Sequence, residues 1–70
     1  MKVYPNPTAG ELIIQSVDGD YTAILFDLNG ARVPVRRSAA GLDMGYLPRG
    51  VYLLRITSNR GSAVTRIIRQ

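Results

Sequence analysis

The sequence contains no cysteine, no histidine and no tryptophan. Without Cys or His it cannot form a disulfide, a Ser-His or Cys-His nucleophile pair, or a thiolate or imidazole zinc site. Long apolar runs are missing too: the longest, at 23–26 and 51–54, have four residues, whereas a membrane helix needs about 20. We therefore predict no catalytic residues, no metal, no cofactor and no membrane insertion.

What is present is an ordinary globular composition in a short chain. The 70 residues allow one small domain. An apolar share of 46% and a charged share of 20% argue against disorder. Residues 1–5 lack the apolar stretch of a signal peptide. If the domain is exported, we expect the export signal to lie elsewhere in a longer chain, or the domain itself to carry a different kind of signal.

Charge is divided unevenly along the chain. Residues 1–31 carry one Lys against four acidic residues, whereas residues 32–70 carry eight Arg against one Asp. This bias permits a basic face for an anionic partner. The alternative is a solvated strand surface with scattered charges. We favour that alternative because the arginines are spread over several predicted strands.

Turn-forming residues recur throughout, roughly every 8–12 residues, which is the spacing of an all-β sandwich or barrel. The segments between them are rich in β-branched and aromatic residues. We predict an immunoglobulin-like β-sandwich of about seven short antiparallel strands. The expected strands are 2–4, 11–16, 21–27, 32–37, 41–44, 50–58 and 62–69.

Residue patterns within these strands predict their positions and facing. The strand 21–27 is apolar on both faces, which indicates a central strand, and Pro34 makes 32–37 an edge strand because it lacks a backbone donor. The strand 62–69 has two possible registers, and the cleaner one avoids burying Arg66. The expected inward side chains are Leu42, Met44, Tyr52, Leu54 and Ile56, with Ala63, Thr65 and Ile67 in the cleaner register of the last strand.

Two short motifs predict local structure. Asn29 and Gly30 are the residues that accept the positive φ angles of a type I′ hairpin turn. The run 47–52, Leu-Pro-Arg-Gly-Val-Tyr, resembles a tyrosine corner, in which the Tyr52 hydroxyl bonds the backbone a few residues upstream. Leu47 would then fill the core beneath the crossing chain.

The residues that could form a calcium, sugar or nucleic-acid site are better explained by structural roles. Asp18 and Asp20 flank Gly19, where aspartate is favoured by turn geometry, and the rest of a calcium motif is absent. A sugar or base platform would need clustered exposed aromatics. Tyr4, Tyr46 and Phe26 are scattered, and basic and aromatic residues are not interleaved, so we predict no nucleic-acid partner.

Five segments in order carry a family resemblance. They are 3–7 (Val-Tyr-Pro-Asn-Pro), 10–12 (Gly-Glu-Leu), 27–30 (Asp-Leu-Asn-Gly), 47–52 and 65–69 (Thr-Arg-Ile-Ile-Arg). This order and spacing resemble the C-terminal sorting domain of the type IX secretion system, type A subfamily, over essentially the whole chain. Its motif residues here are Pro5, Pro7, Asp27, Asn29, Gly30, Leu47, Gly50 and Tyr52.

The resemblance implies that residues 1–70 are a single C-terminal sorting domain cut from a larger cargo protein. It implies recognition by outer-membrane type IX translocon components, and commonly removal by a sortase-like surface protease. It also implies passage through the periplasm to the cell surface or the medium. In the family, the Gly-x-Tyr element and the basic terminal residues matter most for export, which corresponds here to Gly50, Tyr52, Arg66 and Arg69.

The sequence also departs from the family pattern. The family usually has Lys near its end, where this chain has Arg66 and Arg69, and often has Lys after the Asn-Gly turn, where this chain has Ala31 and Arg32. Arginine keeps the charge but presents a planar fork. The alternative function is a passive immunoglobulin-like spacer or carbohydrate-binding module of a surface protein, because many functions share this fold.

Overall fold

The computed structural model describes residues 2–15 and 20–70, and none of them lies in a helix. No helix in this part of the chain is therefore long and apolar enough to cross a membrane. The eight strands are β1 (Lys2–Tyr4), β2 (Glu11–Gln15), β3 (Thr22–Phe26), β4 (Arg32–Val33), β5 (Arg36–Arg37), β6 (Gly41–Asp43), β7 (Gly50–Ser58) and β8 (Gly61–Arg69). The turn at Asp18 and Gly19, and the end of the second expected strand at Ser16, lie outside the described residues.

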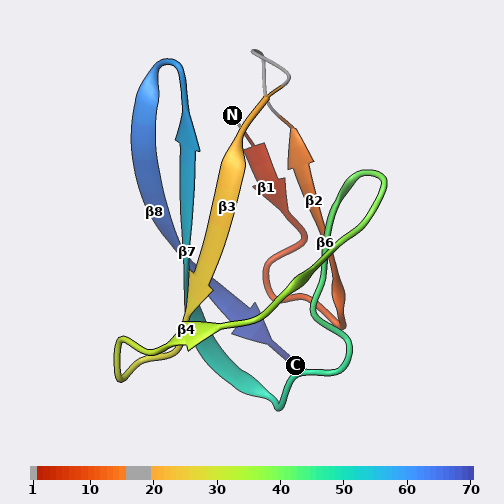
Figure 1. The fold of residues 1–70 in the computed structure, drawn as a ribbon. Helices are drawn as coiled ribbons and strands as arrows, with labels where there is room; N and C mark the ends of the chain where they lie inside the picture. The colour runs from red at the N-terminus through yellow and green to blue at the C-terminus, as the bar shows by residue number, and fades with distance from the viewer. Residues whose placement is uncertain (1, 16–19) are drawn as a thin grey trace.

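The strands form two four-stranded antiparallel sheets, in the orders β1-β2-β6-β5 and β4-β3-β7-β8 (Figure 1). Lettered in chain order, these are A-B-E-D and C′-C-F-G, which is the immunoglobulin arrangement with one additional strand. The predicted all-β sandwich is confirmed. Strand β3 lies between β4 and β7, as its two apolar faces predict.

The predicted single strand at 32–37 is wrong, because the chain changes sheets within it. β4 pairs with β3 in one sheet, and β5 pairs with β6 in the other. Pro34 lies at the crossing, where its missing N–H interrupts no ladder. The edge position is confirmed for both halves, and the split accounts for a larger number of strands than expected.

The core lies between the sheets and contains the predicted inward residues of β6 and β7. It comprises Leu12, Ile14, Leu25, Leu42, Met44, Tyr52, Leu54, Ile56 and Ile67. The cleaner register of the last strand is confirmed at Ile67, which is fully buried, while Thr65 is half-buried. Ala63 is exposed, contrary to expectation, because few side chains of the facing sheet cover it. It lines only a shallow depression, together with Val3, Ile56 and Thr65.

The turn between β3 and β4 has a different geometry from the predicted type I′. Gly30 has a φ of 86°, whereas no other residue type in the described ranges has a positive φ, so Asn29 does not. The Gly30 amide donates to the Asp27 carbonyl at 3.1 Å, and the Asp27 amide to Ala31 at 2.9 Å. This is a type I turn followed by a left-handed glycine, the second common way to close a hairpin. The Asp27 carboxylate accepts the amides of Asn29 and Ala31 at 2.9 and 3.0 Å, which stabilises the turn.

Candidate functional site

The predicted recognition residues lie where β7 begins and β8 ends. Tyr52 is only 7% exposed, and its hydroxyl donates to the Pro48 carbonyl at 2.6 Å. Leu47 packs against the core beneath it. The predicted tyrosine corner is therefore confirmed, and Tyr52 acts in the fold by anchoring the start of β7.

Gly50 opens the same strand and pairs with Arg69 near the end of β8. Its φ is 155°, a backbone conformation that residues with a Cβ rarely adopt. The Gly-x-Tyr spacing thus combines an unusual backbone angle at Gly50 with a buried hydroxyl contact at Tyr52. Both requirements concern how β7 enters the sheet.

The Arg69 guanidinium joins the two sheets at one end of the sandwich. Its Nε donates to the Met44 carbonyl at 3.1 Å, and Nη2 donates to the Gly45 carbonyl at 3.0 Å. Nη1 donates to the carbonyl of Gln70. Arg69 is half-buried, so its charge is directed at backbone carbonyls that follow β6.

Arg66 has the opposite orientation. It pairs with Leu53 of β7 and is exposed, because its position alternates with that of buried Ile67. Of the four predicted recognition residues, Gly50, Tyr52 and Arg69 therefore form one structural cluster at the end of the sandwich. The Arg66 side chain lies on the outer face of the sheet.

A segment that was not predicted from the sequence covers the outer edge of β8. Asn6 Nδ2 donates to the Arg66 carbonyl at 2.7 Å, and the Ile68 amide donates to Asn6 Oδ1 at 3.0 Å. Thr8 continues this pairing: its amide donates to the Ile68 carbonyl at 2.8 Å, and its carbonyl accepts the Gln70 amide at 2.9 Å. We call residues Asn6–Thr8 the edge clamp.

Proline explains the form of the edge clamp. Pro5 and Pro7 have no backbone N–H, so the Asn6 carboxamide supplies the donor and acceptor that a strand residue would otherwise provide. Thr8 is fully buried, and its hydroxyl donates to the Glu11 carbonyl at 2.6 Å and accepts the Gly10 amide at 3.0 Å. A carboxamide between two prolines was the signal in the sequence that could have indicated this role.

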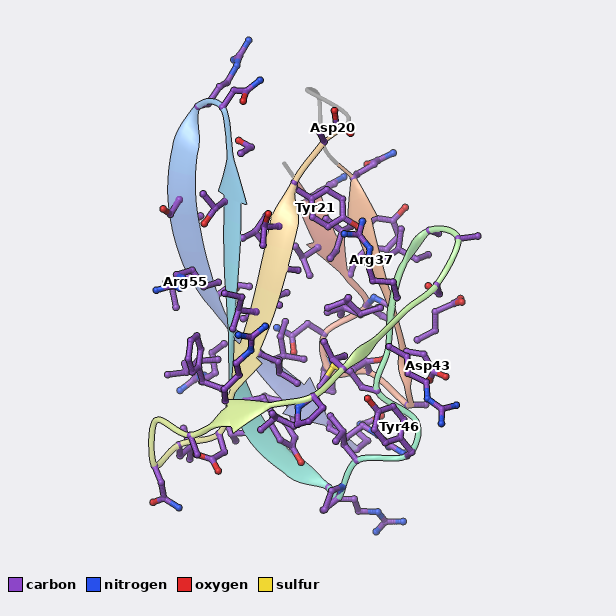
Figure 2. The ribbon with its side chains drawn as sticks, in the orientation of Figure 1. Asp20, Tyr21, Arg37, Asp43, Tyr46 and Arg55 are labelled. Carbon is purple, nitrogen blue, oxygen red and sulfur yellow. The ribbon has the colours of Figure 1, made fainter. Side chains whose placement is uncertain are left out.

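The aromatic residues do not form a shared stacking platform. The guanidinium carbons of Arg37 and Arg36 lie 4.6 and 5.1 Å from the ring centres of Tyr21 and Tyr46, which occupies one face of each ring. Figure 2 shows Tyr21 and Arg37 together, with Tyr46 well apart from them. Tyr4 and Tyr21 do line one shallow depression of about 410 Å³ with Arg37.

Two acidic residues, Asp27 and Asp43, stabilise local structure. Asp43 Oδ1 accepts the Gly45 amide at 2.9 Å, and Asp27 holds the β3–β4 turn as described above. Within residues 2–15 and 20–70, no group of three or more acidic side chains could hold a metal ion.

Comparison with known families gives one finding along nearly the whole chain. A family model described as the secretion system C-terminal sorting domain matches residues 2–70. The match includes the edge clamp, the tyrosine corner and all of β8. Comparison with curated proteins gave no match.

Proposed function

This chain belongs to the family of secretion system C-terminal sorting domains of the Por, or type IX, system, and from that premise we propose how it acts. It is an address read by the outer-membrane translocon, which then exports the cargo protein joined to its N-terminal side. The observation that supports this proposal is the family match over residues 2–70. This family is non-catalytic.

Recognition in this proposal is protein–protein contact with the folded sandwich. Gly50, Tyr52 and Arg69 contribute by fixing the end of the domain, and Arg66 contributes by direct contact. The burial of Tyr52 and the exposure of Arg66 support this division of roles. The order of the motifs along the chain supports the type A subfamily.

The cargo passes through the periplasm and reaches the cell surface or the medium. A sortase-like surface protease then removes the sorting domain.

Strand addition at the end of β8 is disfavoured as the mode of recognition. Partners can extend a sheet by pairing with an open edge, but the edge clamp already bonds this edge at Arg66, Ile68 and Gln70. Recognition through side chains on the outer surface of the domain agrees better with these contacts.

An export assay tests the proposal. Residues 2–70 are fused behind a fluorescent protein that carries a periplasmic signal peptide, in a host with a type IX system. We expect the fusion to reach the surface or medium, and a fusion lacking residues 62–70 to stay in the periplasm. Retention of both, in a host that exports a known cargo, contradicts the proposal and favours the spacer or carbohydrate-binding alternative.

Point variants separate recognition from folding in the same assay. Arg66→Ala removes an exposed side chain and should reduce export, whereas Arg49→Ala, which removes another exposed arginine, should not. Equal export of the two variants would remove Arg66 from the recognition surface.

A further inference from the structure

The outer face of the sheet β4-β3-β7-β8 departs from the usual pattern of a sandwich. An outward sheet face normally carries polar residues in alternation with the core. Here most outward positions of β3, β7 and β8 are apolar, and Val64 is 63% and Ile68 38% exposed. The apolar outward residues are Ile24, Phe26, Val51, Leu53, Val64 and Ile68.

Arginines are interleaved with these apolar residues by the strand register. One row across the sheet runs Arg32–Phe26–Leu53–Arg66, and the next runs Ile24–Arg55–Val64. The Arg55 guanidinium carbon lies 5.5 Å from the centre of the Phe26 ring, which holds the charge over the apolar surface. We call this surface the Arg-apolar face.

All charged side chains at the outward strand positions of this sheet are arginines: Arg32, Arg55 and Arg66. The other sheet differs, because Glu11 and Asp43 are cross-strand neighbours there and Arg36 pairs with Asp43. Figure 2 shows Arg55 and Asp43 on opposite sides of the molecule. The basic bias of the second half of the chain is therefore concentrated, in part, on one face.

We propose that the Arg-apolar face is the docking surface for a protein partner whose own patch sets carboxylates beside apolar side chains. The inference rests on the proposed function, since the partner would be a component of the secretion machinery. Arginine forks bind carboxylates in a bidentate manner, and the apolar side chains between them favour a protein surface with matching apolar groups. A nucleic acid would offer phosphates to the arginines but few apolar groups to Leu53 and Val64. An anionic membrane could contact both kinds of side chain, and the vesicle-binding test below distinguishes it from a protein partner.

The edge clamp preorganises this face. Asn6 bonds the backbone of Arg66 and Ile68 from the open side of β8, while β7 bonds the strand from the other side. The backbone that carries Arg66 is thus held on both edges before any partner binds. A surface fixed in advance loses less conformational freedom on association.

The test uses the export fusion with charge reversals on the two outer faces. Arg55→Glu with Arg66→Glu changes the Arg-apolar face, and Arg36→Glu makes the same kind of change on the opposite sheet. We expect about tenfold or greater loss of export for the double variant, because like charges then meet across the interface, and near-normal export for Arg36→Glu. Val64→Ser is a second variant whose side chain is too exposed to matter much for folding, and it should also reduce export.

Site-directed photocrosslinking gives a direct readout in the same host. A photoreactive residue at Val64 should form an adduct with a secretion component, and the crosslinked peptide should contain Asp or Glu next to apolar residues. The same residue at Gln15, on the other sheet, should form no such adduct. Adducts of equal yield at both positions would overturn the assignment of the face.

The outcomes separate the inference from the proposed function. If the unmodified fusion is retained while a known cargo is exported, the proposed function fails. If the unmodified fusion is exported and the double variant and Val64→Ser are exported equally well, the docking face fails alone. If the purified domain binds a 20-base-pair DNA duplex or phosphatidylglycerol vesicles at about 150 mM salt, and the double variant loses this binding but not export, the partner class is wrong.

Discussion

Asn6, near the start of the chain, accepts a hydrogen bond from the amide of Ile68, 62 residues later, at 3.0 Å. The same carboxamide donates to Arg66. One side chain thus fixes the outer edge of β8 on both sides of Ile67, a fully buried core residue. The proline-containing beginning of this chain and its basic end are therefore parts of one structural unit.

Removing the Asn6 carboxamide should weaken this unit. Asn6→Ala deletes two exposed hydrogen bonds, each worth about 0.5–1.5 kcal/mol, so we expect a loss of about 1–2 kcal/mol in the free energy of unfolding. Urea denaturation measures it. Asn59→Ala, at the tip of the β7–β8 hairpin, is the matched control. Faster hydrogen exchange of the Ile68 amide in Asn6→Ala would identify the clamp as the cause, and unchanged exchange would contradict it.

The tyrosine corner predicts a hydroxyl-specific effect. Tyr52→Phe keeps the buried ring but loses the bond to Pro48, so stability should fall by about 1 kcal/mol, or about 4–8 °C in Tm for a domain of this size. Tyr46→Phe loses a bond from an exposed hydroxyl to the Pro34 carbonyl, which water can replace, and should change Tm less. Equal shifts for the two variants would show that burial of the hydroxyl is unimportant.

Arg69 should not tolerate lysine, although the charge is the same. A lysine ammonium is a compact point donor and cannot reproduce the spread of the guanidinium nitrogens toward Met44 and Gly45. Arg69→Lys should therefore lower the free energy of unfolding by about 1 kcal/mol, whereas Arg49→Lys should leave it unchanged. Thermal unfolding by circular dichroism measures both, and a stable Arg69→Lys variant would show that charge alone suffices.

Substitution of Gly50 should be destabilising because of its backbone conformation. A Cβ at Gly50 would meet no atom within 4 Å, but the φ of 155° is unfavourable for other residues. Gly50→Ala should cost about 1–3 kcal/mol through backbone strain. Gly45→Ala, a glycine outside the positive-φ set, should cost less in the same denaturation measurement. The opposite ranking would indicate that contacts, not φ, decide these positions.

The sequence indicated the features that local chemistry determines. The alternation of Tyr52, Leu54 and Ile56 defined the buried face of β7, and the Leu-Pro-Arg-Gly-Val-Tyr run defined the corner. What escaped prediction depends on distant partners. Pro34 indicates an edge strand. The division of residues 32–37 into β4 and β5 depends on where their partner strands β3 and β6 lie, which the local sequence does not show. Asn6 could not be assigned as a clamp because its partners lie at the other end of the chain.

Local signals also left turn geometry open. Asn29-Gly30 is compatible with two hairpin turns, and the Asp27 carboxylate, which accepts two backbone amides, favours the type I form with glycine in the left-handed position. For the candidate site, three of the four predicted residues, Gly50, Tyr52 and Arg69, lie where β7 begins and β8 ends, and their role in recognition stays a prediction. The preferred register of the last strand already placed Arg66 outward, whereas the contacts of Arg69 with the Met44 and Gly45 carbonyls depend on the fold.

The coverage of the β8 edge by the edge clamp affects how copies of the domain behave at high local concentration. Open strand edges allow one molecule to template another, and natural proteins shorten or cover them. The edge strands β1, β4 and β5 have only three, two and two residues, so among the described strands β8, with nine residues, offers the longest edge. The edge clamp covers the half of β8 nearest the C-terminus, leaving the part near the hairpin at Ser62–Val64. Crowded copies of the domain would therefore resist edge-to-edge aggregation while the arginines on the adjoining face stay exposed.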